Sequence, residues 1–200
     1  PVMDTVARYD TSQPFTTSTS WSIYHTTNVS SNSKGYAGVV YDGRYIYPIP
    51  LATAPGVWTN GTATRYDTTL PFTSADSWET FVITAVDSDS KGFEGGAFDG
   101  RYVYYVPRGA SDAGSHFARY DTTATFTSAG SWTVVDTTGE GFNANAKGFY
   151  GSVWDGRYLY FYPINGTSAL IARYDTTDMT SDAFSTTGNW SFMPLATIDA

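Results

Sequence analysis

The sequence predicts an all-β fold built from repeats of about 55 residues, each with four short antiparallel strands. The first observation is a pattern that occurs at residues 34–50, 91–107 and 147–163, where it reads KGYAGVVYDGRYIYPIP, KGFEGGAFDGRYVYYVP and KGFYGSVWDGRYLYFYP. The second is the motif RYDT, which begins at Arg8, Arg65, Arg119 and Arg173. The third is a Trp after each of these motifs, at Trp21, Trp78, Trp132 and Trp190.

The first two strands of each repeat are predicted to form a β-hairpin around an Asp-Gly pair. In the third copy these strands correspond to residues 151–155 (GSVWD) and 157–163 (RYLYFYP). Asp-Gly between apolar runs is the strongest short hairpin signal, because a type I′ turn requires positive φ at both central residues. We therefore expect Asp and Gly at the centre of each turn.

The second strand of the hairpin predicts a sheet that is covered on both faces. In the third copy Tyr158, Tyr160 and Tyr162 point to one side of the strand. Leu159 and Phe161 point to the other side, so both sides are apolar. A hairpin with one face in water alternates apolar with polar residues, whereas a strand buried on both faces does not.

The last two strands of each repeat are predicted at the other two motifs. The third strand ends in RYDT, and the fourth begins at the Trp, as in WETFVITAV at residues 78–86. No segment shows a convincing 3.6-residue period of apolar residues, which an amphipathic helix would have. The sequence therefore predicts strands and turns throughout.

Four-stranded sheets that are covered on both faces and repeat at this spacing are typical of the blades of a β-propeller. The pattern K-G-F-x-G-G-x-F-D-G-R-Y-x-Y-x-x-P, followed by A-R-Y-D-T and S-W, resembles the tandem blade repeats of bacterial β-propeller proteins, in the general manner of kelch-like propellers. Gly148, Gly151 and their equivalents would then lie on the innermost strand, where blades converge. The alternative fold is a β-trefoil, which also has four strands per repeat but closes after three repeats, whereas RYDT occurs four times.

The repeats predict one domain over residues 1–200, or one segment of a longer propeller. A half blade covers residues 1–27, and blades follow at about 34–86, 91–136 and 147–193. Three and a half blades do not make a ring, because propellers typically have four to eight blades. We expect either further repeats outside this segment or assembly in trans, in which a neighbouring subunit completes the exposed edge.

Composition and charge narrow the classes of partner. The net charge of −8 argues against nucleic acid and anionic membranes, and no apolar run approaches the roughly 18 residues of a membrane-spanning helix. The absence of Cys excludes a disulfide, a thiolate metal site and a Cys nucleophile. A Thr/Ser-rich surface and four glycosylation sequons fit an extracellular, cell-surface or virion-surface location. The sequons lie at Asn28, Asn60, Asn165 and Asn189.

Sequence signatures of catalysis are weak. His25 and His116 occupy non-equivalent positions without metal-ligand spacing, and no G-x-S-x-G motif is present. The acidic loop DSDS at residues 87–90 corresponds to SSNS and NANA in the other repeats, so a solvated loop is favoured over a calcium site. We expect a protein that is not an enzyme and uses no cofactor or metal. The remaining enzymatic alternative is a glycoside hydrolase, with two carboxylates drawn from Glu79, Glu94, Glu140 and the scattered Asp residues.

Most basic residues belong to the repeated motifs, which predicts a structural role for them. Arg and Asp of RYDT lie on one face of a strand, where they can pair with each other or with the next blade. Each Lys begins a K-G pattern and is expected to bind carbonyl groups or an Asp at a blade junction. These residues are Lys34, Lys91 and Lys147. The alternative is a ring of equivalent ligand pockets, each lined by a Lys, a Tyr and a preceding polar residue. Those polar residues are Asn32, Asp89 and Asn145.

Positions that differ between repeats are the candidates for specific binding. They lie mainly between the second and third strands, at residues 51–63, 108–117 and 164–171. Trp58, in the first of these loops, has a flat face that can stack on a sugar or pack over a blade edge. Arg108 and His116, in the second loop, are expected to be surface residues.

Three hypotheses about function follow. The first is a non-enzymatic binding module with a glycan or protein partner, for which carbohydrate is the leading ligand class. The second is a structural subunit of a surface layer, filament or virion that assembles through the incomplete blade. The third is the glycoside hydrolase.

Overall fold

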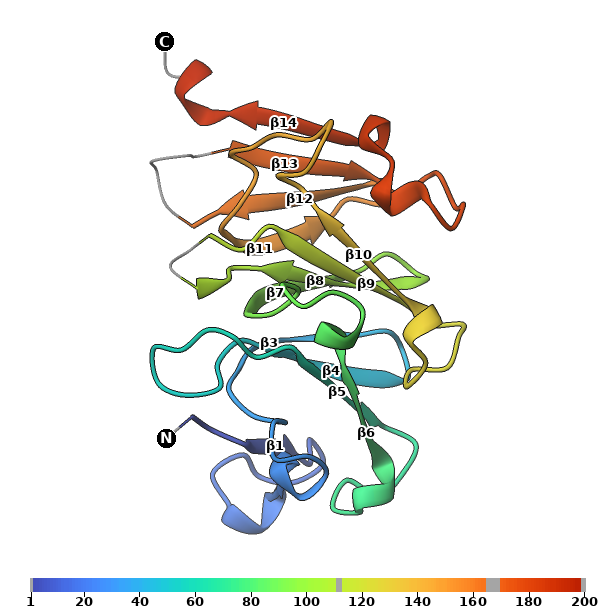
Figure 1. Ribbon diagram of the computed structural model, residues 1–200. Coiled ribbons are helices and arrows are strands. Elements are labelled where there is room, and N and C mark those ends of the chain that lie inside the picture. The colour runs from blue at the N-terminus through green and yellow to red at the C-terminus, as the bar shows by residue number, and fades with distance from the viewer. Residues whose placement is uncertain (1, 111–112, 165–169, 199–200) are drawn as a thin grey trace.

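A computed structural model describes residues 2–110, 113–164 and 170–198 of the chain as an all-β structure (Figure 1). Within these residues fourteen strands form four antiparallel sheets, and the helical segments are short 3₁₀ turns. None of the described helices is long and apolar enough to cross a membrane. The predicted all-β class and the predicted four strands per repeat are therefore confirmed.

The sheets follow the repeats, and neighbouring strands in each sheet follow one another in the chain. The N-terminal sheet contains β1 (Thr5–Tyr9) and β2 (Trp21–His25). The next sheet contains β3 (Tyr36–Tyr41), β4 (Tyr45–Pro50), β5 (Thr62–Asp67) and β6 (Trp78–Val82). The third contains β7 (Phe93–Phe98), β8 (Tyr102–Pro107), β9 (His116–Asp121) and β10 (Trp132–Asp136). The last contains β11 (Phe149–Trp154), β12 (Tyr158–Pro163), β13 (Leu170–Asp175) and β14 (Trp190–Pro194).

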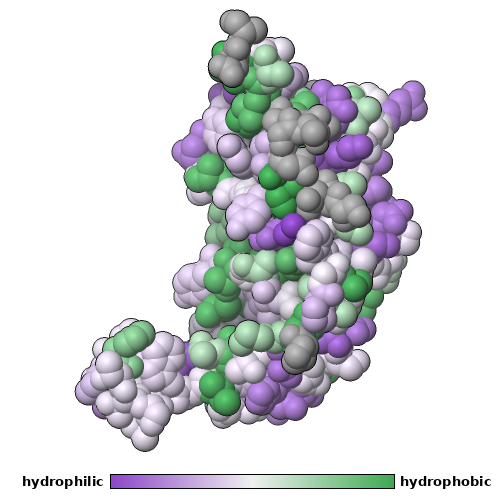
Figure 2. Space-filling model, turned by 90° about the vertical axis from the view of Figure 1, so that its left-hand side faces the viewer, coloured by the Kyte–Doolittle hydropathy of each residue, from purple (hydrophilic) through white to green (hydrophobic). Residues whose placement is uncertain are grey.

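The four sheets are stacked on one another in chain order, from the N-terminal sheet to the β11–β14 sheet (Figure 1). Figure 2 shows one long side of this stack, where polar and apolar side chains are interspersed. No sheet of the described residues closes into a barrel, which the β-trefoil alternative requires, so that alternative is wrong. Among the described residues, no further sheet lies beyond the N-terminal sheet or beyond the β11–β14 sheet.

Glycines allow the first strands of neighbouring sheets to approach closely. A Cβ atom on Gly95 of β7 would lie 2.9 Å from the carbonyl oxygen of Tyr150 and 3.0 Å from the Cα of Gly151, both on β11. The predicted close approach therefore exists between β7 and β11 at Gly151, but Gly148 lies outside the strand, contrary to the prediction. Gly148 precedes β11 and has a φ of 69°, a conformation that favours glycine.

The Asp-Gly hairpins form at the predicted places, but their turns are displaced by one residue from the prediction. The pairing of Tyr41 with Ile46 and the bond from Asp42 N to Tyr45 O, at 3.2 Å, place Gly43 and Arg44 at the centre. Gly43 has a φ of 105°. The Asp42 carboxylate accepts the N–H groups of Arg44 at 2.8 Å and of Tyr45 at 2.6 Å. Asp42 therefore acts as an acceptor beside the turn and is not one of its two central residues.

The core lies between consecutive sheets. Leu159 and Phe161 of β12 are fully buried against the β7–β10 sheet, in a cluster that contains Tyr104 and Val106 of β8. Tyr104 and Val106 point away from Val103 of the same strand, which belongs to the cluster with the β3–β6 sheet. The prediction that both faces of the second strand are covered is therefore confirmed for the β7–β10 sheet.

Each Trp at the start of a fourth strand closes a small aromatic cluster. The Trp Nε1 donates to the carbonyl oxygen of the Phe six residues earlier, and a RYDT tyrosine packs against both rings. In the β7–β10 sheet Trp132 donates to Phe126 at 2.8 Å, and Tyr120 lies 5.1 Å from each ring. We call these clusters the Tyr-Phe-Trp triads. The four triads are Tyr9-Phe15-Trp21, Tyr66-Phe72-Trp78, Tyr120-Phe126-Trp132 and Tyr174-Phe184-Trp190.

The charged groups of RYDT separate into two roles. Arg65 Nη1 donates to the hydroxyl of Tyr120 in the next sheet at 3.0 Å, as the prediction of pairing with the next blade required. Asp67 binds Arg44 from the DGRY motif of its own sheet at 2.6 Å. The alternative in which Arg and Asp of one RYDT pair with each other is wrong at this motif, because each binds a different neighbour.

Candidate functional site

A polar pocket of about 220 Å³ lies beside the β7–β10 sheet, where β9 begins. Side chains of opposite charge line it together with small residues that leave backbone groups accessible. The lining residues are Asp89, Lys91, Gly109, Ala110, Ala113, Gly114, Ser115 and His116. Residues 111–112 of the loop at 108–117 lie outside the described residues, so the pocket is described from the residues on either side of them. Most of the loop at 164–171 also lies outside the described residues.

Lys91 and Asp89 are two of the predicted site residues, and the structure brings both to this pocket. Lys91 Nζ donates to the carbonyl oxygen of Ser88 at 2.9 Å and to Asp89 Oδ1 at 3.2 Å. These partners belong to the loop that precedes Lys91, so its described side-chain bonds lie within that loop rather than across a blade junction. The expected Tyr is not among the lining residues.

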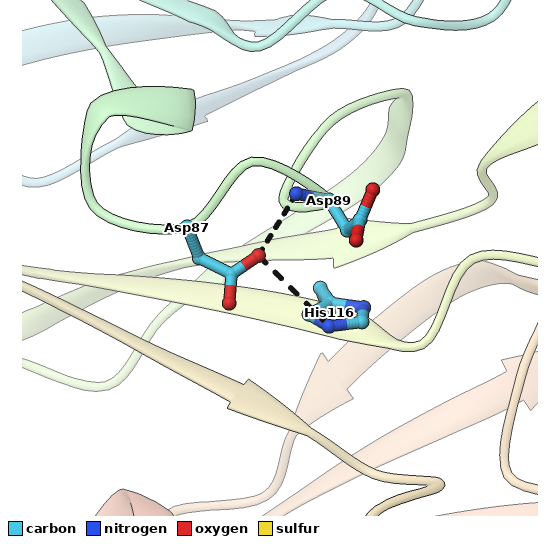
Figure 3. Close-up of side chains that lie close together, drawn as sticks. All are labelled: Asp87, Asp89 and His116. Carbon is cyan, nitrogen blue, oxygen red and sulfur yellow. Dashed lines mark hydrogen bonds and ion pairs between the residues drawn. The ribbon is translucent and has the colours of Figure 1, made fainter.

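Asp87, Asp89 and His116 lie close together (Figure 3), and Asp89 and His116 line this pocket. One ligand atom from each residue lies within 4.8 Å of the other two. His116 Nε2 lies 3.9 Å from Asp87 Oδ1 and 4.0 Å from Asp136 Oδ2. His116 is therefore surrounded by carboxylates, contrary to the expectation of an ordinary surface residue.

The loop that carries the carboxylates does not need their charge to fold. Asp87 Oδ1 accepts the N–H of Asp89 at 2.8 Å, a turn that Asn or Ser can also form. In the last repeat Asn143 makes the same bond to the N–H of Asn145 at 3.0 Å. The two carboxylates are thus additional to what the turn requires, and they distinguish this repeat from the others.

The donor set could hold a divalent cation, since two carboxylates and an imidazole are common metal ligands. The ammonium group of Lys91 already binds Asp89, and a cation at this point would meet its positive charge. The mixture of an ammonium, an imidazole, a hydroxyl and carboxylates suits a neutral ligand with several hydroxyl groups better, because each hydroxyl both donates and accepts.

Hydrogen bonds also hold the Asp136 carboxylate at the edge of the cluster. Burial alone would raise the pKa of Asp136, but bonds from Thr138 and Ser115 outweigh burial and lower it. Thr138 donates to Asp136 Oδ1 through its N–H at 2.9 Å and its hydroxyl at 2.7 Å. Asp136 is therefore a fixed negative charge facing His116.

Trp58, in the loop between β4 and β5, lies in a second cluster that it forms with residues of the next repeat. The Arg108 guanidinium carbon lies 3.6 Å from the centre of the Trp58 ring, and Arg108 Nη1 donates to Glu94 Oε2 at 2.6 Å. The guanidinium therefore stacks on the indole face that was predicted to bind a sugar. Because Gly109 follows Arg108 and lines the polar pocket, the two clusters are neighbours.

The other predicted site residues remain apart from this pocket. Asn32 and Asn145 are exposed, Lys34 is half-buried and Lys147 is exposed. None of them lines the pocket beside β9. The sequence gives no sign that His116 meets the acidic loop, because 25 residues lie between residue 90 and His116. The bond from Ser90 Oγ to the carbonyl oxygen of His116, at 3.2 Å, joins the two segments.

The sequons provide weaker support for a glycosylated surface than the sequence suggested. Asn28 is exposed, whereas Asn60 is 1% exposed and donates to the carbonyl oxygens of Asn32 and Lys34. Asn189 is half-buried and donates to Asp178 and Ala183. Asn165 lies outside the described residues.

Comparison with known proteins adds no family to this description. No protein-family model matches the chain, and no curated protein matches it.

Proposed function

We propose that the chain is a non-enzymatic binding module, located outside the cell or on the surface of a cell or virion, and that it binds carbohydrate in the polar pocket beside β9. The observation that carries the proposal is the pocket itself. It collects Asp89, Lys91 and His116, and the equivalent loops of the other repeats lack the carboxylates. Charged groups that the local turn does not require are candidates for ligand contact.

The proposal includes a β-propeller-type fold, in the general manner of kelch-like propellers. Each four-stranded sheet would be a blade, and residues 1–27 a half blade. The close approach of β7 to β11 at Gly95 and Gly151 supports it, because first strands converge on the axis of a propeller. Further blades, from the same chain or another copy, would complete the ring.

A carbohydrate is the ligand class that the pocket chemistry favours. Sugar hydroxyls donate and accept, and the pocket presents the Asp89 carboxylate as acceptor beside the Lys91 ammonium as donor. Its volume is below the roughly 300–1,000 Å³ of pockets for drug-sized ligands. We therefore infer that one sugar ring binds, with the rest of a glycan outside.

Isothermal titration calorimetry with a panel of monosaccharides tests this proposal. His116→Ala and Asp89→Asn should each weaken binding by about tenfold, equivalent to about 1.4 kcal/mol, because each removes one polar contact. His25→Ala is the matched control, since His25 lies at the end of β2 in the N-terminal sheet. Binding that is unchanged in both pocket variants, or no binding by any sugar, would contradict the proposal.

The glycoside hydrolase alternative has less support from the geometry. Asp87 and Asp89 come from one loop and are linked by the bond from Asp89 N–H to Asp87. Glycoside hydrolysis generally needs carboxyl groups that flank the scissile bond. These two carboxylates approach from the same side, which suits binding.

A structural subunit is the second candidate function. It is favoured by one observation: RYDT arginines join consecutive sheets by the same bond. Arg119 Nη1 donates to the Tyr174 hydroxyl at 3.2 Å, as Arg65 does to Tyr120 at 3.0 Å. A junction that repeats along the stack can in principle extend beyond it.

A further inference from the structure

The outward face of the β11–β14 sheet is apolar and open. Two adjoining grooves of about 410 and 330 Å³ lie on it, and both are lined by Tyr160 and Ile171. Figure 2 shows apolar side chains at the surface near the upper end of the stack, where this sheet lies. We call this surface the open face.

Positions of the open face are buried in the earlier sheets. Tyr162 is 62% exposed, whereas Ile49 and Val106, at the same place in their repeats, are fully buried. Met193 is 46% exposed, and its equivalent Phe81 is 9% exposed. The open face thus resembles the faces that meet at the junctions between sheets, but no described sheet covers it.

The junction between the two middle sheets shows what such a face receives. The Tyr120 and Phe126 rings of one triad each lie 6.1 Å from the ring of Tyr47 in the preceding sheet. Arg65 donates to the Tyr120 hydroxyl, and its guanidinium carbon lies 4.6 Å from the centre of Phe126. A Tyr and an Arg therefore receive the Tyr and Phe of the next triad.

The following junction repeats this arrangement. Tyr104 lies 6.0 Å from Tyr174 and 5.6 Å from Phe184. Arg119 donates to the Tyr174 hydroxyl and lies 4.9 Å from the centre of Phe184. At the N-terminal junction, Arg8 likewise lies 4.9 Å from the centre of Phe72.

The open face carries the same two receiving residues. Tyr160 occupies the place of Tyr47 and Tyr104, and Arg173 is the RYDT arginine of the last repeat. The guanidinium carbon of Arg173 lies 4.3 Å from the centre of the Tyr158 ring. Arg119 lies over Tyr102 at 4.1 Å in the same way, so Arg173 already has the orientation of a junction arginine.

The opposite end of the chain carries an exposed triad. Phe15 lies 5.2 Å from Tyr9 and 5.0 Å from Trp21, which donates to the Phe15 carbonyl oxygen at 2.8 Å. Phe15 is 63% exposed, whereas Phe72 and Phe126 at the same place are 3% and 0% exposed. This triad has the form that the middle junctions bury, and it faces no preceding sheet in the described residues.

We propose that a second copy of this chain docks head to tail, with its Tyr9-Phe15-Trp21 triad on the open face of the first. Phe15 and Tyr9 of one copy contact Tyr160 and Arg173 of the other. Two different surfaces meet, so the contact is heterologous and leads to longer chains or a closed ring. The inference deepens the structural-subunit candidate and does not involve the polar pocket, so failure of either leaves the other testable.

Sedimentation velocity of the 200-residue chain over a range of concentrations tests the docking. The wild type should associate reversibly, and Phe15→Ala and Arg173→Ala should each weaken association by at least about tenfold. Tyr162→Ser is the matched control on the open face. A triad on two strands reaches Tyr160 and Arg173, whereas the equivalents of Tyr162 are covered by the inner hairpin of a complete sheet, so this variant should associate like the wild type.

Mixing the two weakened variants tests the head-to-tail direction. Phe15→Ala retains the open face, and Arg173→Ala retains the triad, so an equimolar mixture should form dimers that do not extend. A monomeric wild type at all soluble concentrations would overturn the proposal, as would association unaffected by either variant. Circular dichroism verifies folding, and Arg173→Ala keeps the test valid if Phe15→Ala unfolds its sheet.

Discussion

The RYDT aspartate illustrates how one residue fixes two loops. Asp67 accepts bonds from Arg44 of the preceding hairpin and from the N–H and hydroxyl of Thr69. The bond from Arg44 holds the pKa of Asp67 well below its usual range despite burial, and the bonds from Thr69 contribute less. The DGRY and RYDT motifs therefore occur together because their side chains bind each other.

Asp67→Asn should lower the free energy of unfolding by about 1–2 kcal/mol at neutral pH, because a charge-assisted bond to Arg44 is lost. The lowered pKa means that the folded wild type binds fewer protons than the unfolded chain near pH 4. The stability contribution is therefore present above about pH 4 and is lost as the pH falls below it. Urea unfolding at several pH values measures the difference between wild type and variant, which should narrow in acid.

Asp10→Asn is the control for this pH dependence. Asp10 occupies the same RYDT position, but the described residues give it bonds to Ser12 and no DGRY arginine. Its replacement should cost less than that of Asp67. Equal losses for the two variants, or a difference between wild type and Asp67→Asn that widens in acid, would refute the assigned role.

At the level of single residues, the sequence predicted positions better than partners. Asp89 and Lys91 were predicted site residues, and they meet in the polar pocket. His116 was expected to be an ordinary surface residue, because its contact with the acidic loop depends on how that loop folds over β9. Trp58 was predicted from its chemistry alone, and the stacking of Arg108 on it depends on a loop one repeat away.

At the scale of the structural elements, the contribution of a triad to the free energy of unfolding depends on how deeply its Phe is buried. Phe126 is fully buried between two sheets, whereas Phe15 occupies the same place in its triad and is exposed. Phe126→Ala should destabilise the chain by about 3–5 kcal/mol, because a large cavity forms. Phe15→Ala should cost much less. Chemical unfolding of both variants checks this contrast, and similar losses would show that triads stabilise their own sheet only.

The glycines of the first strands provide a second matched pair. A Cβ on Gly95 would meet β11 backbone at 2.9 and 3.0 Å, whereas one on Gly151 would meet nothing within 4 Å. Gly95→Ala should therefore destabilise the chain by about 1–3 kcal/mol through overpacking. Gly151→Ala should be neutral or slightly stabilising, because it restricts the unfolded chain. Thermal unfolding measures both, and the reverse order would contradict the stacked arrangement.

The elements themselves could largely be predicted from the sequence. Short runs that are apolar on both faces, together with the Asp-Gly pairs between them, identified the hairpins, because run length and turn chemistry are local properties. The centre of the turn was predicted one residue early, since the Asp42 carboxylate accepts two backbone N–H groups instead of occupying the turn. The 3₁₀ turns before each Trp, such as Ala75–Ser77, have no periodic signal and were not predicted.

At the scale of the whole molecule, the repeat count predicted an open structure with an incomplete first blade. It did not predict which side chains the two ends present, because burial of equivalent positions is visible only in the folded stack. The sequence predicted a covered face at Tyr158, Tyr160 and Tyr162, but Tyr162 is 62% exposed because no described sheet lies on that face. Phe15, at the other end of the stack, is 63% exposed. The repeated junction therefore relates the RYDT motif of each repeat to the proposed association of two chains.

The proposed function places a sugar in the polar pocket beside β9. Mapping of backbone amide shifts by ¹H–¹⁵N NMR during titration with a monosaccharide that binds tests it most directly. We expect the shifts to be concentrated at residues 87–91 and 113–116, with little change on the open face around Tyr160. Shifts concentrated on the open face, or around Lys34 and Lys147 instead of Lys91, would contradict it.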